Sequence, residues 1–358
     1  MKKQAIMALT GNIQQVACIR QVRFLEGRAG GMGAYQVRNG PLSFLIMADK
    51  CLDIGEFEYK GVNFSFLSKP GLIGRTHYDT NGMEAQRSIM GGFLFTAGTE
   101  NICAPCQEGE RHYPMHGRLR TTPAEYRGCD ACWRKGEYVL SVRGEMREAE
   151  LFGGNIVLRR SIETVYGQKK LHICDSYENC AFQASPFLLL YHFNFGWPFL
   201  SEKTYVTLPT KRVVPRDAAS SSHLQAWHIM ESPHPNAAET VFIHDLVANQ
   251  SGKTCVAIMS DEWKLGLLIE FDHHWLPYFM QWKSVASGDY VLGLEPSNTS
   301  VYGRAYQKNH GGLPMLRPHE ERKIEFTITV LDGMEEIEAA KLKIDRLLQE
   351  GSIQHDTF

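Results

Sequence analysis

The chain has 358 residues, enough to bury a large core, and its length alone allows one or two domains. A formal net charge of −2 with 22% charged residues describes an ordinary surface, without the electrostatic footprint of a nucleic-acid-binding protein. The opening MKKQAIMALTGN has too short an apolar run for a signal peptide, and no stretch is long enough to cross a bilayer. Nine cysteines without a secretion signal predict reduced thiols and a cytoplasmic protein. No linker or repeat interrupts the chain, so we expect a single domain over residues 1–358.

The N-terminal part, up to about Gly61, has the pattern of short strands separated by glycine turns. Asp53 lies in LSFLIMADKCLDIGEFEYKG, where it could meet a substrate hydroxyl or an arginine, or cap a turn. The polar, glycine-rich stretch Lys69–Ile89, which contains Arg75 and His77, is interpreted as a loop that leads into a buried strand.

Two cysteine pairs follow this strand. Cys103 and Cys106, and then Cys129 and Cys132, have the C-x2-C spacing of a four-thiolate zinc site, with a slightly long loop between them. The first pair also follows a buried strand, where cysteine is an ordinary small apolar residue. We expect no metal, with the zinc site as the alternative.

His116, Arg118 and Arg120 alternate in MHGRLRTTPAE as they would on one face of a short strand. Three such polar side chains cannot all be buried without partners. The face is therefore either solvated, or it lines a cleft that binds polyhydroxylated or anionic ligands.

The stretch PFLLLYHFNFGWP, Pro186–Pro198, is a clear strand pattern with one wholly apolar face. Its other face becomes polar at its end, where His192 and Asn194 point the same way. A histidine and an asparagine together at a strand end suggest a binding site, although a single histidine is more often a core residue satisfied by a neighbour.

A second polar strand end occurs in YVLGLEPSN, Tyr290–Asn298. Glu295 lies in an otherwise apolar strand, after Gly293 and before a proline that ends the strand. Such a carboxylate is either half of a structural ion pair or a general base with open space in front of it.

The remaining chain is predicted to be mostly strand. Alternation from Ile324 to Val330 indicates a half-exposed strand, and apolar residues from Ile337 to Leu348 recur at helical spacing. We therefore predict an all-β fold, a large twisted antiparallel β-sandwich with a short C-terminal helix that only packs.

YHFNFGWP, GLEPSN and the His-Gly of MHGRLRTTPAE resemble, in this order, the signature elements of the aldose 1-epimerase (galactose mutarotase-like) superfamily. GGFLFTAGTENI and LFGGNIVLRR are similar to an uncharacterised bacterial branch of it. The resemblance extends from about Asp49 to Gly333 and implies a supersandwich fold. It also counts against zinc, because the His-Gly between the cysteine pairs is used there for substrate.

The resemblance implies an isomerase that interconverts sugar anomers, with Glu295 as base and His192 as acid, and without a cofactor. The implied substrate-binding residues are His116, Arg118, Asn194, Lys283 and Asp53. Lys283, and less so Arg304, could bind a substrate carboxylate, phosphate or sulfonate. The expected partner is a small sugar or sugar acid, rather than a nucleic acid or a membrane.

Two other functions remain open at this point. The fold could serve as a non-catalytic carbohydrate-binding or regulatory module, or as an isomerase that acts on the open-chain sugar. The cations near His116 favour a sugar with an acidic group. The sequence gives neither the sugar, its preferred anomer nor the oligomeric state.

Overall fold

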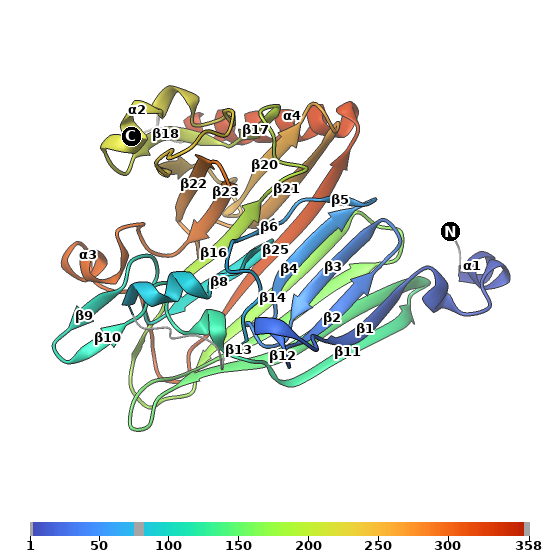
Figure 1. Cartoon of the computed structure of the whole chain (residues 1–358), viewed down its shortest axis with the longest axis horizontal. Helices are drawn as coiled ribbons and strands as arrows, with labels where there is room; N and C mark the ends of the chain where they lie inside the picture. The colour runs from blue at the N-terminus through green and yellow to red at the C-terminus, as the bar shows by residue number, and fades with distance from the viewer. Residues whose placement is uncertain (1–2, 75–81, 354–358) are drawn as a thin grey trace.

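The computed structural model describes residues 3–74 and 82–353, and its three large sheets pair antiparallel, which confirms the predicted all-β fold (Figure 1). A five-stranded sheet has the order β1 (Cys18–Arg23), β2 (Gly33–Arg38), β3 (Leu42–Met47), β4 (Asp53–Tyr59) and β5 (Val62–Asn63). An eight-stranded sheet has the order β11 (Glu125–Arg134), β12 (Glu137–Ala149), β13 (Asn155–Val165), β14 (Lys170–Asn179), β25 (Glu321–Asp332), β21 (Leu265–Asp272), β20 (Lys253–Ser260) and β17 (Thr204–Thr207). A six-stranded sheet has the order β18 (Thr210–Pro215), β19 (Thr240–Leu246), β22 (Tyr278–Ala286), β23 (Asp289–Ser297), β16 (Leu188–Phe195) and β8 (Leu94–Thr99).

Short elements connect these sheets. Three small ladders pair β6 (Phe66–Leu67) with β7 (Gly91–Gly92), β9 (Cys106–Glu108) with β10 (Arg111–Tyr113), and β15 (Ser185–Pro186) with β24 (Met315–Leu316). The helices are α1 (Lys3–Leu9), α2 (Ala218–Ser222), α3 (Gly303–Asn309) and α4 (Met334–Ile353), and the 3-10 turns are η1 (Ile13–Gln15), η2 (Gly27–Ala29), η4 (Gly82–Arg87), η5 (Leu119–Thr121) and η6 (Leu224–Ala226). None of the helices within residues 3–74 and 82–353 is long and apolar enough to span a membrane. Arg75 and His77 of the predicted loop lie outside the described residues.

The core forms where the apolar faces of the sheets meet. The odd-numbered side chains of β16 point into it: Tyr191 and Phe193 pack against Phe326 of β25, with ring centroids 4.6 and 5.4 Å apart. Phe57 of β4 stacks on Phe93 at 4.4 Å and brings the five-stranded sheet into the same core. The period-2 alternation seen in the sequence therefore fixes which face of each strand is buried.

A buried ion network crosses this core. Arg160 of β13 pairs with Asp53 of β4 and Asp175 of β14, both at 2.7 Å, and none of the three side chains is exposed. Asp53 also accepts hydrogen bonds from the backbone N–H and hydroxyl of Thr96, and Tyr191 donates to Asp175. The network joins the three large sheets around one guanidinium.

The helix α4 covers the outer face of the eight-stranded sheet, beside the strand ends labelled β20 and β21 in Figure 1. Ile337, Ala340, Ile344 and Leu347 pack against Leu268 and its neighbours, which confirms the predicted apolar stripe of this helix. Its first turn is anchored by the Asp332 backbone N–H, which donates to Glu336 at 2.9 Å.

Candidate active site

His192 and Glu295 face each other across neighbouring strands. β16 pairs with β23 so that Phe193 lies opposite Leu294 and Asn194 opposite Gly293, which places His192 opposite Glu295. His192 Nε2 lies 3.2 Å from Glu295 Oε1, and only 11% and 6% of the two side chains is exposed. Two strand ends more than 100 residues apart in sequence thus supply one buried imidazole–carboxyl pair.

Gly293 makes room for this pair. A Cβ at this position would lie 2.8 Å from His192 Cε1 and 3.0 Å from Glu295 Oε1. The aromatic rings of Phe95 and Trp282 meet the His192 ring edge-to-face, with centroids 6.1 and 5.4 Å away. The imidazole is therefore held between two aromatic rings and a glycine, in one orientation.

His116 reaches the same place from a tight turn. Both His116 and Gly117 have positive φ, 58° and 69°, and a Cβ on Gly117 would lie 2.2 Å from the Gly98 carbonyl oxygen. The turn brings the His116 ring to 6.2 Å from the His192 ring. The predicted strand from His116 to Arg120 is therefore wrong: the backbone turns at His116 and continues as η5.

The electrostatics of the pair follow from its burial. Burial lowers the pKa of His192 to about 3, against a smaller opposing contribution from Asn194. Burial also raises the pKa of Glu295 to about 8; the Glu239 charge adds to this shift, and Arg216 opposes it. The pKa of His116 lies well below its ordinary value because of burial and the neighbouring His192 and Arg120. At neutral pH Glu295 is therefore protonated and His192 is neutral, so the pair carries no net charge.

Two nitrogens of this site are buried without a hydrogen-bond partner among the described residues: Nδ1 of His116 and Nδ1 of His192. A buried polar group left in this way costs about 1–3 kcal/mol. These two nitrogens are therefore free to bond to a ligand.

A chain of polar contacts next to the pair was not identified from the sequence. The Trp282 indole N–H donates to Glu239 at 2.8 Å, and Arg216 pairs with Glu239 at 3.0 Å and with Asp217 at 2.8 Å. Met280 lies opposite Glu295 and Trp282 lies opposite Gly293 in the paired strands. Because side chains two residues apart share a face of a strand, the sequence could have placed Trp282 on the face of Glu295 once this pairing was known. Arg216 and Glu239 are the ends of an irregular polar excursion that carries no such signal.

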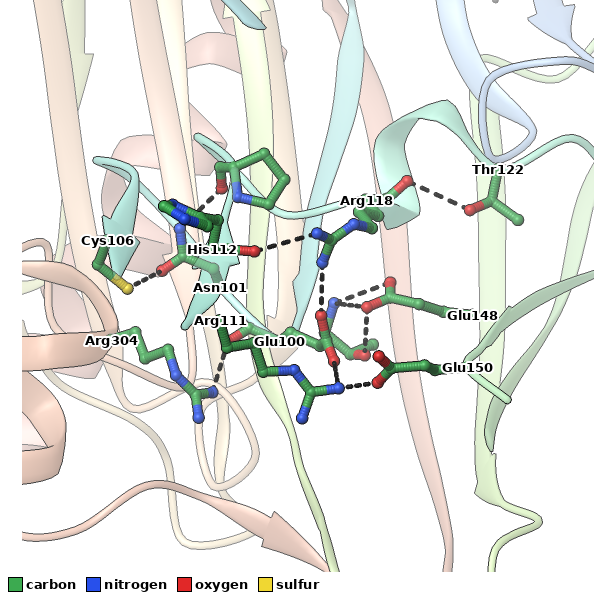
Figure 2. A network of polar contacts seen from close by, with 12 residues as sticks. Glu100, Asn101, Cys106, Arg111, His112, Arg118, Thr122, Glu148, Glu150 and Arg304 are labelled. Atoms are coloured by element: carbon green, nitrogen blue, oxygen red, sulfur yellow. Dashed lines mark hydrogen bonds and ion pairs between the residues drawn. The ribbon is translucent and has the colours of Figure 1, made fainter. Parts of the chain in front are cut away.

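Asn194 and Arg118 lie near the pair but point elsewhere. The Asn194 amide donates to the Gly92 carbonyl at 3.1 Å, which ties β16 to β7. Arg118 pairs with Glu100 at 2.8 Å and donates to the His112 carbonyl, as Figure 2 shows. The structure thus places Asn194 as a support of the strand end and Arg118 in a neighbouring polar network.

Lys283 and Asp53 are not part of this site, which corrects the prediction for both. Lys283 projects from the opposite face of β22, because Trp282 takes the face of Glu295. Its ammonium pairs with Glu231 at 2.6 Å and donates to two backbone carbonyls. Asp53 belongs to the core network of Arg160 and is fully buried.

Arg304 and Arg120 are also placed differently from the sequence expectation. Arg304 is buried, pairs with Glu108 and stacks on Tyr113, so its charge is already matched by a carboxylate of the protein. Arg120 is buried and donates to Ser88. The cations that suggested an acidic substrate therefore do not line one face.

The cysteine pairs do not form the alternative zinc site. Within the described ranges, no group of three or more His, Cys, Asp or Glu side chains could hold a metal ion. Cys129 and Cys132 lie on the edge strand β11, whereas Cys103 lies near Glu295, whose charge contributes to its raised thiol pKa after the larger effect of burial.

Comparisons with known proteins show the fold. The family described as "Domain of unknown function (DUF4432)" matches residues 29–330, and no curated protein matches the chain. A Klebsiella pneumoniae structure named as a putative aldose 1-epimerase is similar at 21% identity and a TM-score of 0.88, covering 93% of this chain and 88% of its own. A galactose mutarotase-like protein from Clostridium acetobutylicum is similar at 14% identity and a TM-score of 0.62, with 89% and 99% covered. Galactose 1-epimerase from Lactobacillus acidophilus has 13% identity and a TM-score of 0.56, with 88% and 99% covered. The architecture is thus the galactose mutarotase-like sandwich.

Proposed function

This chain belongs to the family described as a domain of unknown function (DUF4432), and we propose that it interconverts the anomers of a small sugar by acid–base catalysis. The observation that carries the proposal is the buried His192–Glu295 pair, with a contact of 3.2 Å. Similarity in fold to a protein named as a putative aldose 1-epimerase and to one named as galactose 1-epimerase supports the reaction class.

The two oxygens that take part in the reaction are bonded to the same carbon, so two adjacent side chains can reach them together. Glu295 takes the proton of the anomeric hydroxyl, the C1–O double bond forms, and the bond from C1 to the ring oxygen breaks. His192 gives its proton to the ring oxygen. Rotation about the C1–C2 bond followed by the reverse steps closes the other anomer, and both side chains regain their starting protonation states.

The pair carries the single proton that this mechanism needs. Between pH about 3 and about 8, burial leaves the proton on Glu295 and His192 neutral. Transfer of that proton across the hydrogen bond gives a carboxylate base and an imidazolium acid without changing the total charge. Above pH about 8 the pair loses this proton and with it the acid.

His116 supports the same reaction from the side. Its ring lies edge-on to Phe95, with centroids 5.4 Å apart, and it faces His192. Burial keeps His116 neutral, so one ring nitrogen can donate a hydrogen bond to a sugar oxygen without adding a second positive charge. We assign His116 to substrate binding.

Polarimetry or proton NMR of freshly dissolved single anomers tests the proposal, with a panel of aldohexoses, aldopentoses and hexuronic acids. At least one sugar should equilibrate faster with the protein than in buffer. His192→Ala and Glu295→Gln should each lower this exchange by roughly a hundredfold or more while the protein stays folded. Glu325→Gln, on an exposed position of β25, is the matched control and should exchange as the wild type does.

The outcomes separate the alternatives. Equal exchange in wild type and Glu295→Gln would make Glu295 a structural carboxyl group and would remove the proposed mechanism. Binding of a sugar without exchange would point to a non-catalytic module, and appearance of a ketose would point to an isomerase that acts on the open-chain form.

A further inference from the structure

A cavity of about 620 Å³ lies beside the turn that carries His116, and none of its lining residues belongs to the His192–Glu295 pair. It is formed by the segment from Thr99 to Arg118, the hairpin between β12 and β13, the loop before β15 and Arg304 of α3, whose charge is paired with Glu108. Figure 2 shows the polar side chains that converge there. A volume of this size is typical of a ligand pocket and exceeds what one sugar ring fills.

The charged groups of the cavity balance each other. Glu100 accepts from Arg118 at 2.8 Å and lies 3.8 Å from Arg111, which also pairs with Glu150. Both guanidiniums remain about half exposed. The lining thus offers fixed donors and acceptors without an excess of one charge, which suits a neutral ligand with many hydroxyl groups better than an ion.

Glu148, which also lines the cavity, has a carboxyl group with a raised pKa. Its carboxyl group accepts from the Thr99 backbone N–H at 3.1 Å and from the Thr99 hydroxyl at 3.2 Å. Burial, and then the charge of Glu100, raises the pKa of Glu148 to about 8, against the hydrogen bonds from Thr99 and the charge of Arg118. A carboxyl group held in its neutral form can donate an O–H to a ligand, and perturbed groups of this kind in a cleft mark candidate functional sites.

The rim of the cavity is apolar and exposed. Phe152, at the tip of the β12–β13 hairpin, lines the cavity and is 101% exposed, with Leu151 beside it also exposed. Phe182, in the loop that contributes Ala181 and Gln183 to the lining, is exposed as well. An exposed ring next to polar groups offers a flat surface for the C–H face of a sugar, while the groups behind it bind the hydroxyls.

We propose that this cavity is a second binding site, which takes a neutral carbohydrate of two or more rings. Phe152 supports the apolar face of one ring, and Glu148, Glu100, Arg111 and Arg118 bind hydroxyls. The site does not depend on anomer exchange. Since Arg118 and His116 belong to one turn, an occupied cavity would lie directly beside the proposed active site.

Saturation-transfer difference NMR with maltotriose, cellotriose and lactose, and with glucose as the one-ring comparison, tests the site. At least one oligosaccharide should give saturation transfer that Phe152→Ala and Glu148→Gln each weaken at least fivefold. Leu25→Ala, a change at another exposed apolar residue, is the matched control and should leave the signal unchanged. Glu295→Gln should also leave it unchanged, because Glu295 does not line the cavity.

The readout needs no turnover, so failure of the proposed reaction and failure of this site are distinguishable. No saturation transfer from any of the oligosaccharides, or a signal that survives both cavity substitutions, would overturn the site. A signal lost only in Glu295→Gln would assign the binding to the first site instead. Phe152→Ala should keep the anomer exchange of a monosaccharide at the wild-type rate.

Discussion

Gly293→Ala tests the candidate active site with a single methyl group. Gly293 lies in the middle of β23, and the three atoms nearest to an added Cβ all belong to the pair: His192 Cε1 at 2.8 Å, Glu295 Oε1 at 3.0 Å and His192 Nδ1 at 3.2 Å. Its backbone conformation is one that alanine adopts without strain, since its φ is not in the left-handed region. The substitution therefore disturbs the pair and little else.

The size of the effect follows from these distances. Carbon atoms pack at about 3.5–4.0 Å, so the imidazole has to retreat by about 0.7 Å or rotate away from Glu295. A displacement of about 1 Å in a catalytic constellation costs on the order of a hundredfold. We expect anomer exchange to fall by about tenfold to a hundredfold. Overpacking costs about 1–3 kcal/mol of unfolding free energy, and the lower entropy of the unfolded alanine chain offsets about 0.4–1 kcal/mol of it.

The assay compares anomer exchange and thermal unfolding of Gly293→Ala with those of Gly128→Ala. Gly128 also lies in a strand, β11, but its nearest neighbour for an added Cβ is Arg143 Nε at 4.0 Å. Gly128→Ala should keep both properties. Full exchange in a folded Gly293→Ala would show that the geometry of His192 and Glu295 does not limit the reaction, and would refute this reasoning.

Four further outcomes follow from the same contacts. Glu239→Gln removes a negative charge that raises the pKa of Glu295, so the alkaline limb of the pH–rate profile should move to lower pH; an unchanged limb would contradict the assignment. Because the pKa of Glu295 is raised from 4.5 to about 8 by folding, wild-type stability should fall relative to Glu295→Gln as pH rises from about 4.5 to about 8, measured by denaturant unfolding across this range. Arg160→Met leaves two buried carboxylates without their cation and should lower the unfolding free energy by about 3–5 kcal/mol, whereas Arg159→Met, at a half-exposed position, should change it by about 1 kcal/mol or less. Arg118→Gln should leave the ratio of exchange rates for a hexose and its hexuronic acid unchanged. A selective fall in the exchange rate of the acid would instead support a preference for an acidic sugar.

Much of the fold could be predicted from local pattern. Alternation in the strand Leu188–Phe195 separates a core face from a functional face, and the spacing from Ile337 to Leu347 gives the packed helix. The order of strands in each sheet could not be predicted from local pattern, because strand pairing depends on contacts between residues far apart in sequence. Thr204–Thr207 and Glu321–Asp332, for example, join the same eight-stranded sheet.

Alternation of polar residues predicted the wrong backbone between His116 and Arg120. His116, Arg118 and Arg120 alternate as in a strand, but the chain turns at His116 because Gly117 packs against the carbonyl oxygens of Gly98 and Asn101. That contact is made between segments that meet only in the folded sheet, so no local signal predicts it. After the turn Arg118 faces Glu100 and Arg120 is buried.

The placement of Lys283 shows that strand register decides the chemistry of the site. β22 pairs with β23 so that Met280 lies opposite Glu295 and Trp282 opposite Gly293. A shift by one residue would turn Lys283 to the face of Glu295 and give the carboxyl group a cationic neighbour, which would lower its pKa. In the observed register Lys283 lies on the opposite face of the sheet and pairs with Glu231, while Glu295 faces His192 and lies opposite Met280. Burial raises the pKa of Glu295, on which the proposed proton transfer depends, and the pairing of the two strands preserves this shift because it keeps the Lys283 ammonium away from the carboxyl group.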